Sequence, residues 1–282
     1  MYIETATVSS SKTHRRKFLI AAANGIALYV LTYYFVWGVH QAAELAVSYY
    51  FHLRGLWDPS GIRYTLADNE WWRTAIVAVY SSGPMVCLIL GLVAFRWYWQ
   101  SGRAQRGNFK LLLLWMTFHA CNAVFGALLA DTFTQSGSWY VPDWLLRLGT
   151  EVDVLLALLA GLAQLSLGYF GAVAFLQAHD SHTVMRFSNR QLMVVSTLII
   201  PWVAGSVFIG LTKVPFFTVQ EALHLAMMGL LVTPMALGCL NEIFSETVKR
   251  PQTTGVAWGL VGLAIVVALF WRLALSPPLT FG

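Results

Sequence analysis

The hydrophobic residues of this chain are gathered in long blocks that polar and charged residues separate. Seven blocks lie at about residues 17–39, 72–96, 111–131, 149–176, 193–212, 219–240 and 254–275. Each block is long enough to cross a hydrocarbon layer of about 30 Å as a helix. The pattern therefore predicts an all-α, polytopic integral membrane protein with about seven transmembrane helices.

The charged residues between the blocks indicate an orientation, because Lys and Arg are retained on the cytoplasmic side of short loops. With the N-terminus inside, the cytoplasmic segments hold twelve basic residues and the outer segments six. The twelve are Lys12, Arg15, Arg16, Lys17, Arg96, Arg103, Arg106, Lys110, Arg186, Arg190, Lys249 and Arg250. We expect residues 1–16 to form a cytoplasmic basic tail and residues 17–282 a single transmembrane helical domain.

The composition narrows the class of protein. Of the 282 residues, 57% are hydrophobic and 11% are charged, whereas soluble domains have roughly 25% charged residues. The net charge of +5 does not indicate nucleic-acid binding, because no soluble segment combines a basic patch with interleaved aromatic residues. The expected partners are the lipid bilayer and other membrane subunits, and the expected location is the plasma or inner membrane.

The three cysteines lie inside apolar blocks, so they predict neither a disulfide framework nor a CxxC metal motif.

Aromatic residues gather at the predicted ends of the blocks, as they do at membrane interfaces. The outer ends carry Trp57, Trp71, Trp72, Trp139, Tyr140, Trp144, Phe216 and Phe217, and the inner end of the second block carries Trp97, Tyr98 and Trp99. The outer loop at 51–71 contains the turn signal "DPSG" at 58–61. This loop could form a small lid.

Ionisable residues within membrane helices are costly and mark candidate sites. His40 and Glu44 are expected to end the first helix, Asp131 to end the third, and Glu221 with His224 to begin the sixth, all toward the outer face. Spacings of i, i+4 and i, i+3 put each His and Glu on one helical face. Two such pairs could bind zinc, iron or manganese, with Asp131 as a further ligand. The alternative is that they snorkel to the interface or pair with Arg54, Arg73 or Arg147.

Three further residues are candidates for a second shell or proton relay: His119, Asn122 and Glu151. His119 lies near the middle of the third block, about 18 Å of helix rise from Asp131. The face through His119, Asn122, Gly126 and Ala130 is polar or small, which is typical of a helix packed closely against a neighbour. His119 and Asn122 could therefore hydrogen-bond across helices.

The stretch "VYSSGPMVCLILGLVAF" at 79–95 resembles the Gly-Pro helix that follows the HExxH helix in site-2 intramembrane metalloproteases. Its distance from His40 and the order of elements are similar, and Asn122 to Asp131 is a loose counterpart of that family's later Asn-and-Asp segment. The resemblance covers about residues 30–135. It implies a metal held near His40.

The sequence departs from that family at catalytic positions. HExxH requires a Glu after the first His as general base, and this chain has Gln41 there, with Glu44 at the second His position. Glu44 can still ligate zinc, so a site of His40, Glu44 and Asp131 is chemically feasible, but hydrolysis would need another base. The family's site also opens toward the cytoplasm, whereas the charge distribution places His40 outside. Peptidase activity is not expected.

Other membrane and enzyme classes are tested by single residues. The last apolar block has no Lys for a retinal Schiff base, so a rhodopsin is excluded. No GxSxG or P-loop motif appears. A b-type haem between His40 and His224 stays an alternative.

The preferred hypothesis is a membrane protein with an outward-opening polar, metal-binding cavity and a degenerate protease-like core. The alternative is a non-catalytic transport or membrane-complex subunit.

Overall fold

The computed structural model describes residues 3–102, 105, 107–147, 149–179, 190–241 and 255–282. The long helices are α1 (Ile3–Tyr50), α2 (Arg73–Gln100), α3 (Gly107–Cys121), α6 (Thr150–Gln177), α9 (Ile200–Lys213), α11 (Gly229–Leu240) and α12 (Trp258–Ala274). Shorter helices are α4 (Ala127–Thr134), α5 (Tyr140–Leu146), α8 (Arg190–Val194) and α10 (Val219–Met227). Three strands, β1 (Gly55–Asp58), β2 (Gly61–Tyr64) and β3 (Leu279–Phe281), form a small sheet.

Several of these helices join into membrane-length spans. The π-helical turn Asn122–Gly126 links α3 to α4, and the π-helical turn Val195–Ile199 links α8 to α9. Within the described part of the chain, six helical spans are long and apolar enough to cross a membrane: Arg15–Tyr50, Arg73–Gln100, Gly107–Thr134, Thr150–Gln177, Arg190–Lys213 and Val219–Leu240. The predicted all-α class, with helices long and apolar enough to cross a membrane, is thus confirmed. The seventh block is the shorter apolar helix α12.

The first helix is longer than predicted. It runs without a break to Tyr50 and ends where His52 adopts a left-handed conformation, with φ 55°. The expectation that His40 and Glu44 end this helix was therefore wrong, and both lie inside it. The stretch after residue 39 contains neither Gly nor Pro to stop a helix, so falling hydrophobicity was a poor guide to the boundary.

The hydrophobic core lies among α1, α3, α6, α9, α11 and α12. Its largest fully buried side chains include Trp115, Tyr29 and Phe175. The rings of Tyr29 and Trp115 meet edge to face, with centroids 5.0 Å apart. This contact fixes α3 against the middle of α1.

Other helix faces expose large apolar side chains. Leu155, Leu158, Leu159 and Leu162 are exposed on α6, and α2 and α12 carry similar rows. Soluble monomers rarely expose such continuous apolar surfaces, and exposed rows of this kind are consistent with helices that cross a membrane.

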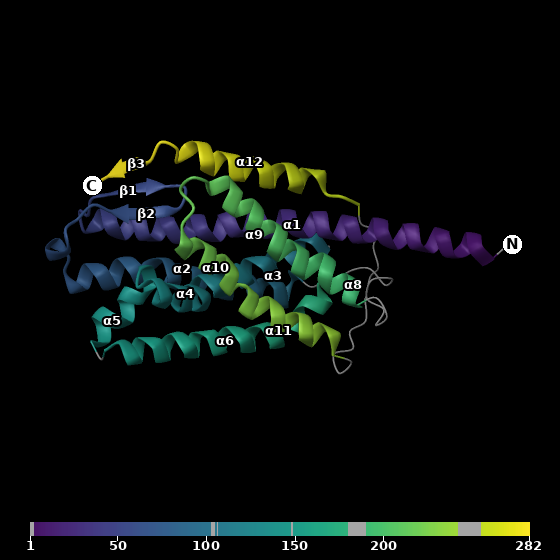
Figure 1. The fold of residues 1–282 in the computed structure, drawn as a ribbon, viewed down its shortest axis with the longest axis horizontal. Coiled ribbons are helices and arrows are strands. Elements are labelled where there is room, and N and C mark those ends of the chain that lie inside the picture. Colours follow the sequence, from purple (N-terminus) through teal and green to yellow (C-terminus); the bar gives the residue numbers. More distant parts are fainter. Residues whose placement is uncertain (1–2, 103–104, 106, 148, 180–189, 242–254) are drawn as a thin grey trace.

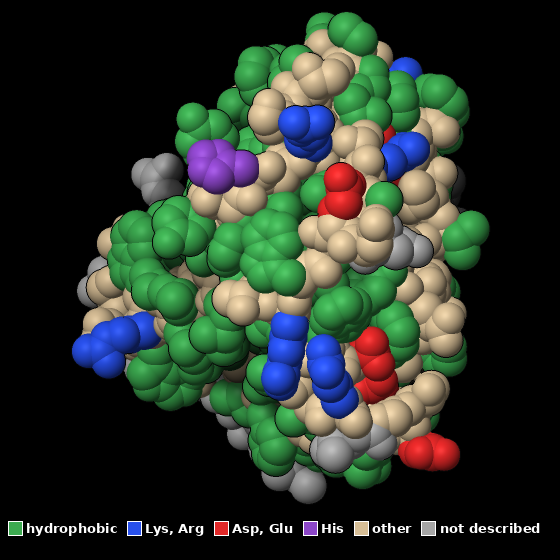
Figure 2. Space-filling view, turned by 90° about the vertical axis from the view of Figure 1, so that its left-hand side faces the viewer, with side chains coloured by type: hydrophobic (Ala, Val, Ile, Leu, Met, Phe, Trp, Pro, Cys, Tyr) green, Lys and Arg blue, Asp and Glu red, His purple; other side chains and the backbone are tan. Residues whose placement is uncertain are grey.

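The strands form an antiparallel sheet in the order β2-β1-β3. The predicted "DPSG" turn is the hairpin turn between β1 and β2, where Asp58 Oδ1 accepts hydrogen bonds from the backbone N–H groups of Ser60 and Gly61. Figure 1 shows this sheet, α5 and the C-terminus at the left end of the molecule, with the N-terminus at the opposite end. The left end carries charged side chains of both signs among hydrophobic ones (Figure 2).

Candidate functional site

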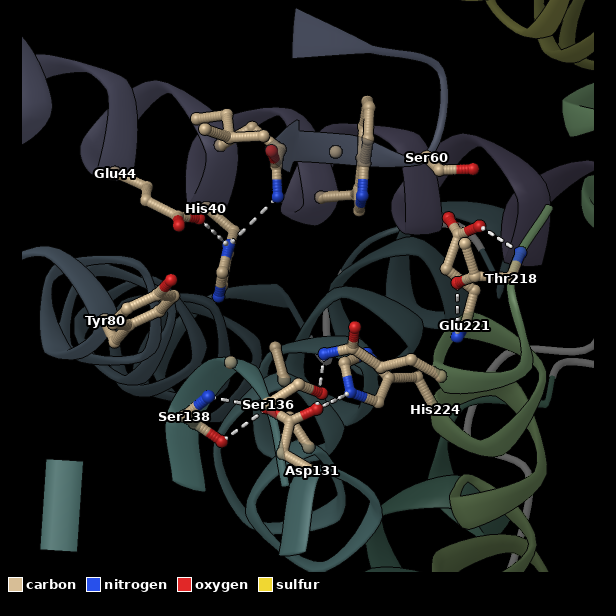
Figure 3. Close-up of a pocket in the computed structure, with 18 of the residues that line it drawn as sticks. His40, Glu44, Ser60, Tyr80, Asp131, Ser136, Ser138, Thr218, Glu221 and His224 are labelled. Carbon is tan, nitrogen blue, oxygen red and sulfur yellow. Dashed lines mark hydrogen bonds and ion pairs between the residues drawn. The ribbon is translucent and has the colours of Figure 1, made fainter. Parts of the chain in front are cut away.

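A cavity of about 450 Å³ lies beneath the hairpin. Residues of α1, β2, α2, α4 and α10 line it. Figure 3 shows His40 and Glu44 on the α1 side, with Asp131 and His224 across the cavity from them. The volume falls within the range of about 300–1,000 Å³ that is usual for small-molecule sites.

The α1 wall carries His40, Gln41 and Glu44. Nδ1 of His40 lies 3.9 Å from a Glu44 carboxylate oxygen and 3.5 Å from the side-chain amide nitrogen of Gln41. The His40 ring packs against Gly83 of α2, at a point where a Cβ atom would overlap the ring. Gly83 therefore makes room for the imidazole, and α2 limits its movement.

Tyr64 connects the hairpin to this wall. Its hydroxyl donates a hydrogen bond of 3.3 Å to Glu44 and is 2.7 Å from the hydroxyl of Ser48. Burial raises the pKa of Tyr64 far above its ordinary value, and the nearby Glu44 carboxyl raises it further. The phenol therefore stays protonated in the physiological range and serves as a donor to Glu44.

Asp131 organises the opposite wall. Its Oδ1 accepts hydrogen bonds from Gln220, at 2.7 Å, and from Nε2 of His224, at 2.6 Å. Its Oδ2 accepts from both the backbone N–H and the hydroxyl of Ser138, each at 2.7 Å. The Asp131 side chain is 3% exposed and that of His224 is 32% exposed. The carboxylate is thus fully hydrogen-bonded and orients an imidazole that remains accessible from the cavity.

Glu221 has a different partner from the one that the sequence suggested. It forms a buried ion pair with Lys213, the last residue of α9. Nζ of Lys213 also donates to the Tyr33 hydroxyl, at 2.9 Å, and lies 4.3 Å from the ring centroid of Trp37. Thr218 and Glu221 complete a capping box at the start of α10. This pair joins α1, α9 and α10 at one border of the cavity.

His119 and Asn122 bond across helices, as expected. A ring nitrogen of His119 is 3.1 Å from the backbone oxygen of Tyr29 on α1. Asn122 donates to the backbone oxygen of His224, at 2.9 Å, and accepts from Gln164, at 2.8 Å. Both residues therefore have structural partners at the deep side of the cavity.

The cavity brings together most of the candidates from the sequence. Its lining includes His40, Glu44, Asp131, Glu221, His224, His119 and Asn122. Glu151 is not among the lining residues and is exposed on the first turn of α6. Among the described residues, no three His, Cys, Asp or Glu side chains are close enough together to hold a metal ion. The His and acid groups instead form separate pairs on two walls.

Sequence reasoning missed Lys213, Tyr64, Tyr80, Gln220 and Ser138. Lys213 was counted with the outer basic residues, because a lysine at the end of an apolar block is expected to snorkel to the interface. Tyr64, Tyr80 and Ser138 carry no spacing pattern. Their role depends on how the loops fold over the helices.

The chain matches no protein family model, no curated protein and no solved structure.

Proposed function

We propose that this chain is a multi-pass membrane protein that binds a cation in the cavity between α1 and α10. The observation that carries the proposal is the placement of two His–carboxylate pairs, His40 with Glu44 and His224 with Asp131, on opposite walls of one cavity. Imidazole nitrogens and carboxylate oxygens are the ligands that zinc takes in proteins. Zinc or another divalent metal ion is accordingly the first cation to test.

The donor types suit zinc. Among the described residues no three of them are close enough together to hold the ion, so zinc would have to draw the two walls together. His40 and His224 would be its ligands, with Glu44 completing the set. Asp131 accepts a hydrogen bond from Nε2 of His224, so Nδ1 is the nitrogen that would bind the ion. A carboxylate commonly orients a metal-binding imidazole in this way. The deeper His119 and Asn122 would support this wall rather than contact the ion.

Metal analysis and zinc titration of the purified chain test this proposal. We expect stoichiometric zinc, with at least a tenfold loss of affinity in His40→Ala and in His224→Ala. His52→Ala is the matched control, because His52 is exposed in the loop after α1. Zinc binding that both cavity variants retain would overturn the assignment of these ligands.

We further propose that the core is a degenerate relative of site-2 proteases without peptidase activity. The proposal rests on the order of the His-bearing helix, the Gly-Pro helix and the later Asn-and-Asp segment along the sequence. Gln41 stands where that family has its catalytic Glu, and an amide cannot accept a proton at neutral pH. Neither the unmodified chain nor Gln41→Glu should cleave a transmembrane peptide. Chelator-sensitive cleavage by the unmodified chain would contradict the proposal.

A second candidate function is a non-catalytic transport or membrane-complex subunit. It is favoured by the four hydrogen bonds to Asp131 and by the Lys213–Glu221 pair, since these acids already have partners within the chain. Purified protein that lacks zinc and binds no added metal would favour this candidate.

The topology that accompanies the proposal has seven crossings, with the N-terminus in the cytoplasm and the cavity opening outward, in the plasma or inner membrane. The excess of basic residues at one end supports this orientation. Of those basic residues, Arg103, Arg106, Arg186, Lys249 and Arg250 lie outside the described residues. The seventh crossing is α12, whose 17 residues give about 26 Å of helix at 1.5 Å per residue.

A further inference from the structure

One side of the cavity is formed by a group of aromatic rings that metal binding does not explain. The rings of Tyr64, Trp71, Tyr80 and Tyr140, which we call the aromatic wall, all line the cavity. Ring centroids are 5.0 Å apart for Tyr64 and Trp71, 6.0 Å for Tyr64 and Tyr80, and 5.1 Å for Tyr80 and Tyr140. The four rings are therefore one continuous group.

The rings of the aromatic wall meet at a corner. Tyr64 stands at 84° to Trp71 and at 78° to Tyr80, whereas Trp71 and Tyr80 are inclined by only 31°. A corner of nearly perpendicular rings offers aromatic surfaces to a ligand from two directions. Such surfaces attract cations through the ring quadrupole, and they recognise quaternary ammonium groups in particular.

A carboxylate adjoins this corner. Glu44 lies beside the Tyr64 hydroxyl, at 3.3 Å, and Figure 3 shows Tyr80 next to His40 and Glu44. Of the three acids that line the cavity, Asp131 receives four hydrogen bonds and Glu221 is paired with Lys213. Glu44 has the weakest partners, the Tyr64 hydroxyl and a histidine nitrogen 3.9 Å away. A cation bound here would favour the ionised form of Glu44 and compensate its charge.

Interfacial anchoring does not account for the aromatic wall. Trp72 has the exposure of an anchor, at 44%, and contacts Phe51 with centroids 5.9 Å apart. The neighbouring Trp71 turns the other way and lines the cavity with Tyr80. Trp72 is therefore an exposed side chain, whereas Trp71 forms part of the cavity wall.

We propose that the aromatic wall and Glu44 bind an organic ammonium group. The inference rests on the proposed function, because it assigns the class of cation to the same cavity. The quaternary or protonated nitrogen lies at the corner of the rings, near Glu44, and the rest of the ligand extends toward His224. The ammonium group belongs either to a free amine or to a lipid head group.

Calorimetric titration of the full chain in maltoside detergent tests the assignment, with choline and its neutral isostere 3,3-dimethylbutan-1-ol as probes. The two probes have the same shape and differ in charge. We expect choline to bind at least tenfold more tightly than the alcohol. Equal affinities would overturn the inference, and this comparison needs no variant.

Variants locate the site. Tyr80→Leu should weaken choline binding about tenfold, whereas Tyr80→Phe, which keeps the ring, should stay within about threefold of the unmodified chain. Glu44→Gln should also weaken binding about tenfold. Trp258→Leu is the control, since Trp258 is 74% exposed on α12. Unchanged choline binding in a folded Tyr80→Leu protein would contradict the site.

The two proposals fail in different ways. Zinc binding without choline binding overturns the ammonium inference and leaves the cation cavity in place, and binding of neither cation overturns both.

Reconstitution into nanodiscs distinguishes the two sources of the ammonium group, a lipid head group and a free amine. Choline binding that persists in phosphatidylglycerol nanodiscs and is lost in phosphatidylcholine nanodiscs assigns the site to a lipid head group. Equal binding in both assigns it to a free amine.

Discussion

Asp131 Oδ1 and His224 Nε2 are 2.6 Å apart, although 93 residues separate the two in sequence. This hydrogen bond joins α4 to α10 within the cavity wall opposite His40. Gln220 and Ser138 fill the remaining acceptor positions of Asp131. The stability of this region and the shape of the site therefore depend on one carboxylate.

Removal of that carboxylate should destabilise the protein. Asp131→Ala leaves the donors of Ser138, Gln220 and His224 without their acceptor, which should lower the free energy of unfolding by about 2–4 kcal/mol. Unfolding by SDS titration in mixed micelles measures this loss. Glu151→Gln is the control, because Glu151 is exposed, and it should change stability by less than about 1 kcal/mol. Equal losses in the two variants would argue against the central role of Asp131.

The Lys213–Glu221 pair should behave as a coupled unit. Lys213→Met leaves the Glu221 carboxylate buried without its cation, and this should cost about 3–5 kcal/mol of stability. The double variant Lys213→Met, Glu221→Gln leaves no uncompensated charge, so its loss should be clearly smaller than the sum of the two single losses. A double-mutant cycle of SDS unfolding free energies measures the coupling. Additive losses would mean that the two charges do not stabilise each other.

The orientation is tested by cysteine labelling in intact cells. With the native Cys87, Cys121 and Cys239 replaced by Ala, Ser101→Cys at the end of α2 should be protected from an impermeant maleimide. Glu151→Cys at the start of α6 should react, because the two positions lie at opposite ends of the spans and the basic residues gather at the end that holds Ser101. The reverse pattern would invert the proposed topology.

The membrane class and most spans could be predicted from the sequence, because a run of about twenty apolar residues has few other stable solutions. The second predicted block, 72–96, corresponds to α2 at Arg73–Gln100, and the sixth, 219–240, ends at Leu240 as predicted. The extension of α1 to Tyr50 was missed. Residues such as Gln41 and Ser48 lower the hydropathy of that stretch without disfavouring a helix.

The candidate site was predictable in its residues and not in their pairing. Periodicity places His40 with Glu44 on one helical face, and the structure keeps them near each other. Periodicity also suggested that Glu221 and His224 act together. In the structure Glu221 pairs with Lys213 and His224 with Asp131, because partners on other helices compete with neighbours on the same helix. Such choices depend on tertiary packing, which sequence spacing does not encode.

The contact between Gly83 and His40 gives the last prediction. A methyl group at position 83 would overlap the imidazole ring, so Gly83→Ala should displace His40 from its place in the cavity wall. We expect the free energy of unfolding to fall by about 1–3 kcal/mol, as for other overpacked sites. Zinc affinity, measured by titration, should fall with it.

The matched control for this substitution is Gly262→Ala in α12, where no atom lies within 4 Å of the added methyl group. Alanine is the better helix former by about 1 kcal/mol, so this variant should be as stable as the unmodified chain or slightly more stable. The two substitutions make the same chemical change in helices and differ in what the methyl group meets. If Gly83→Ala were as stable as Gly262→Ala and bound zinc normally, the ring of His40 would have room to move, and α2 would not position it.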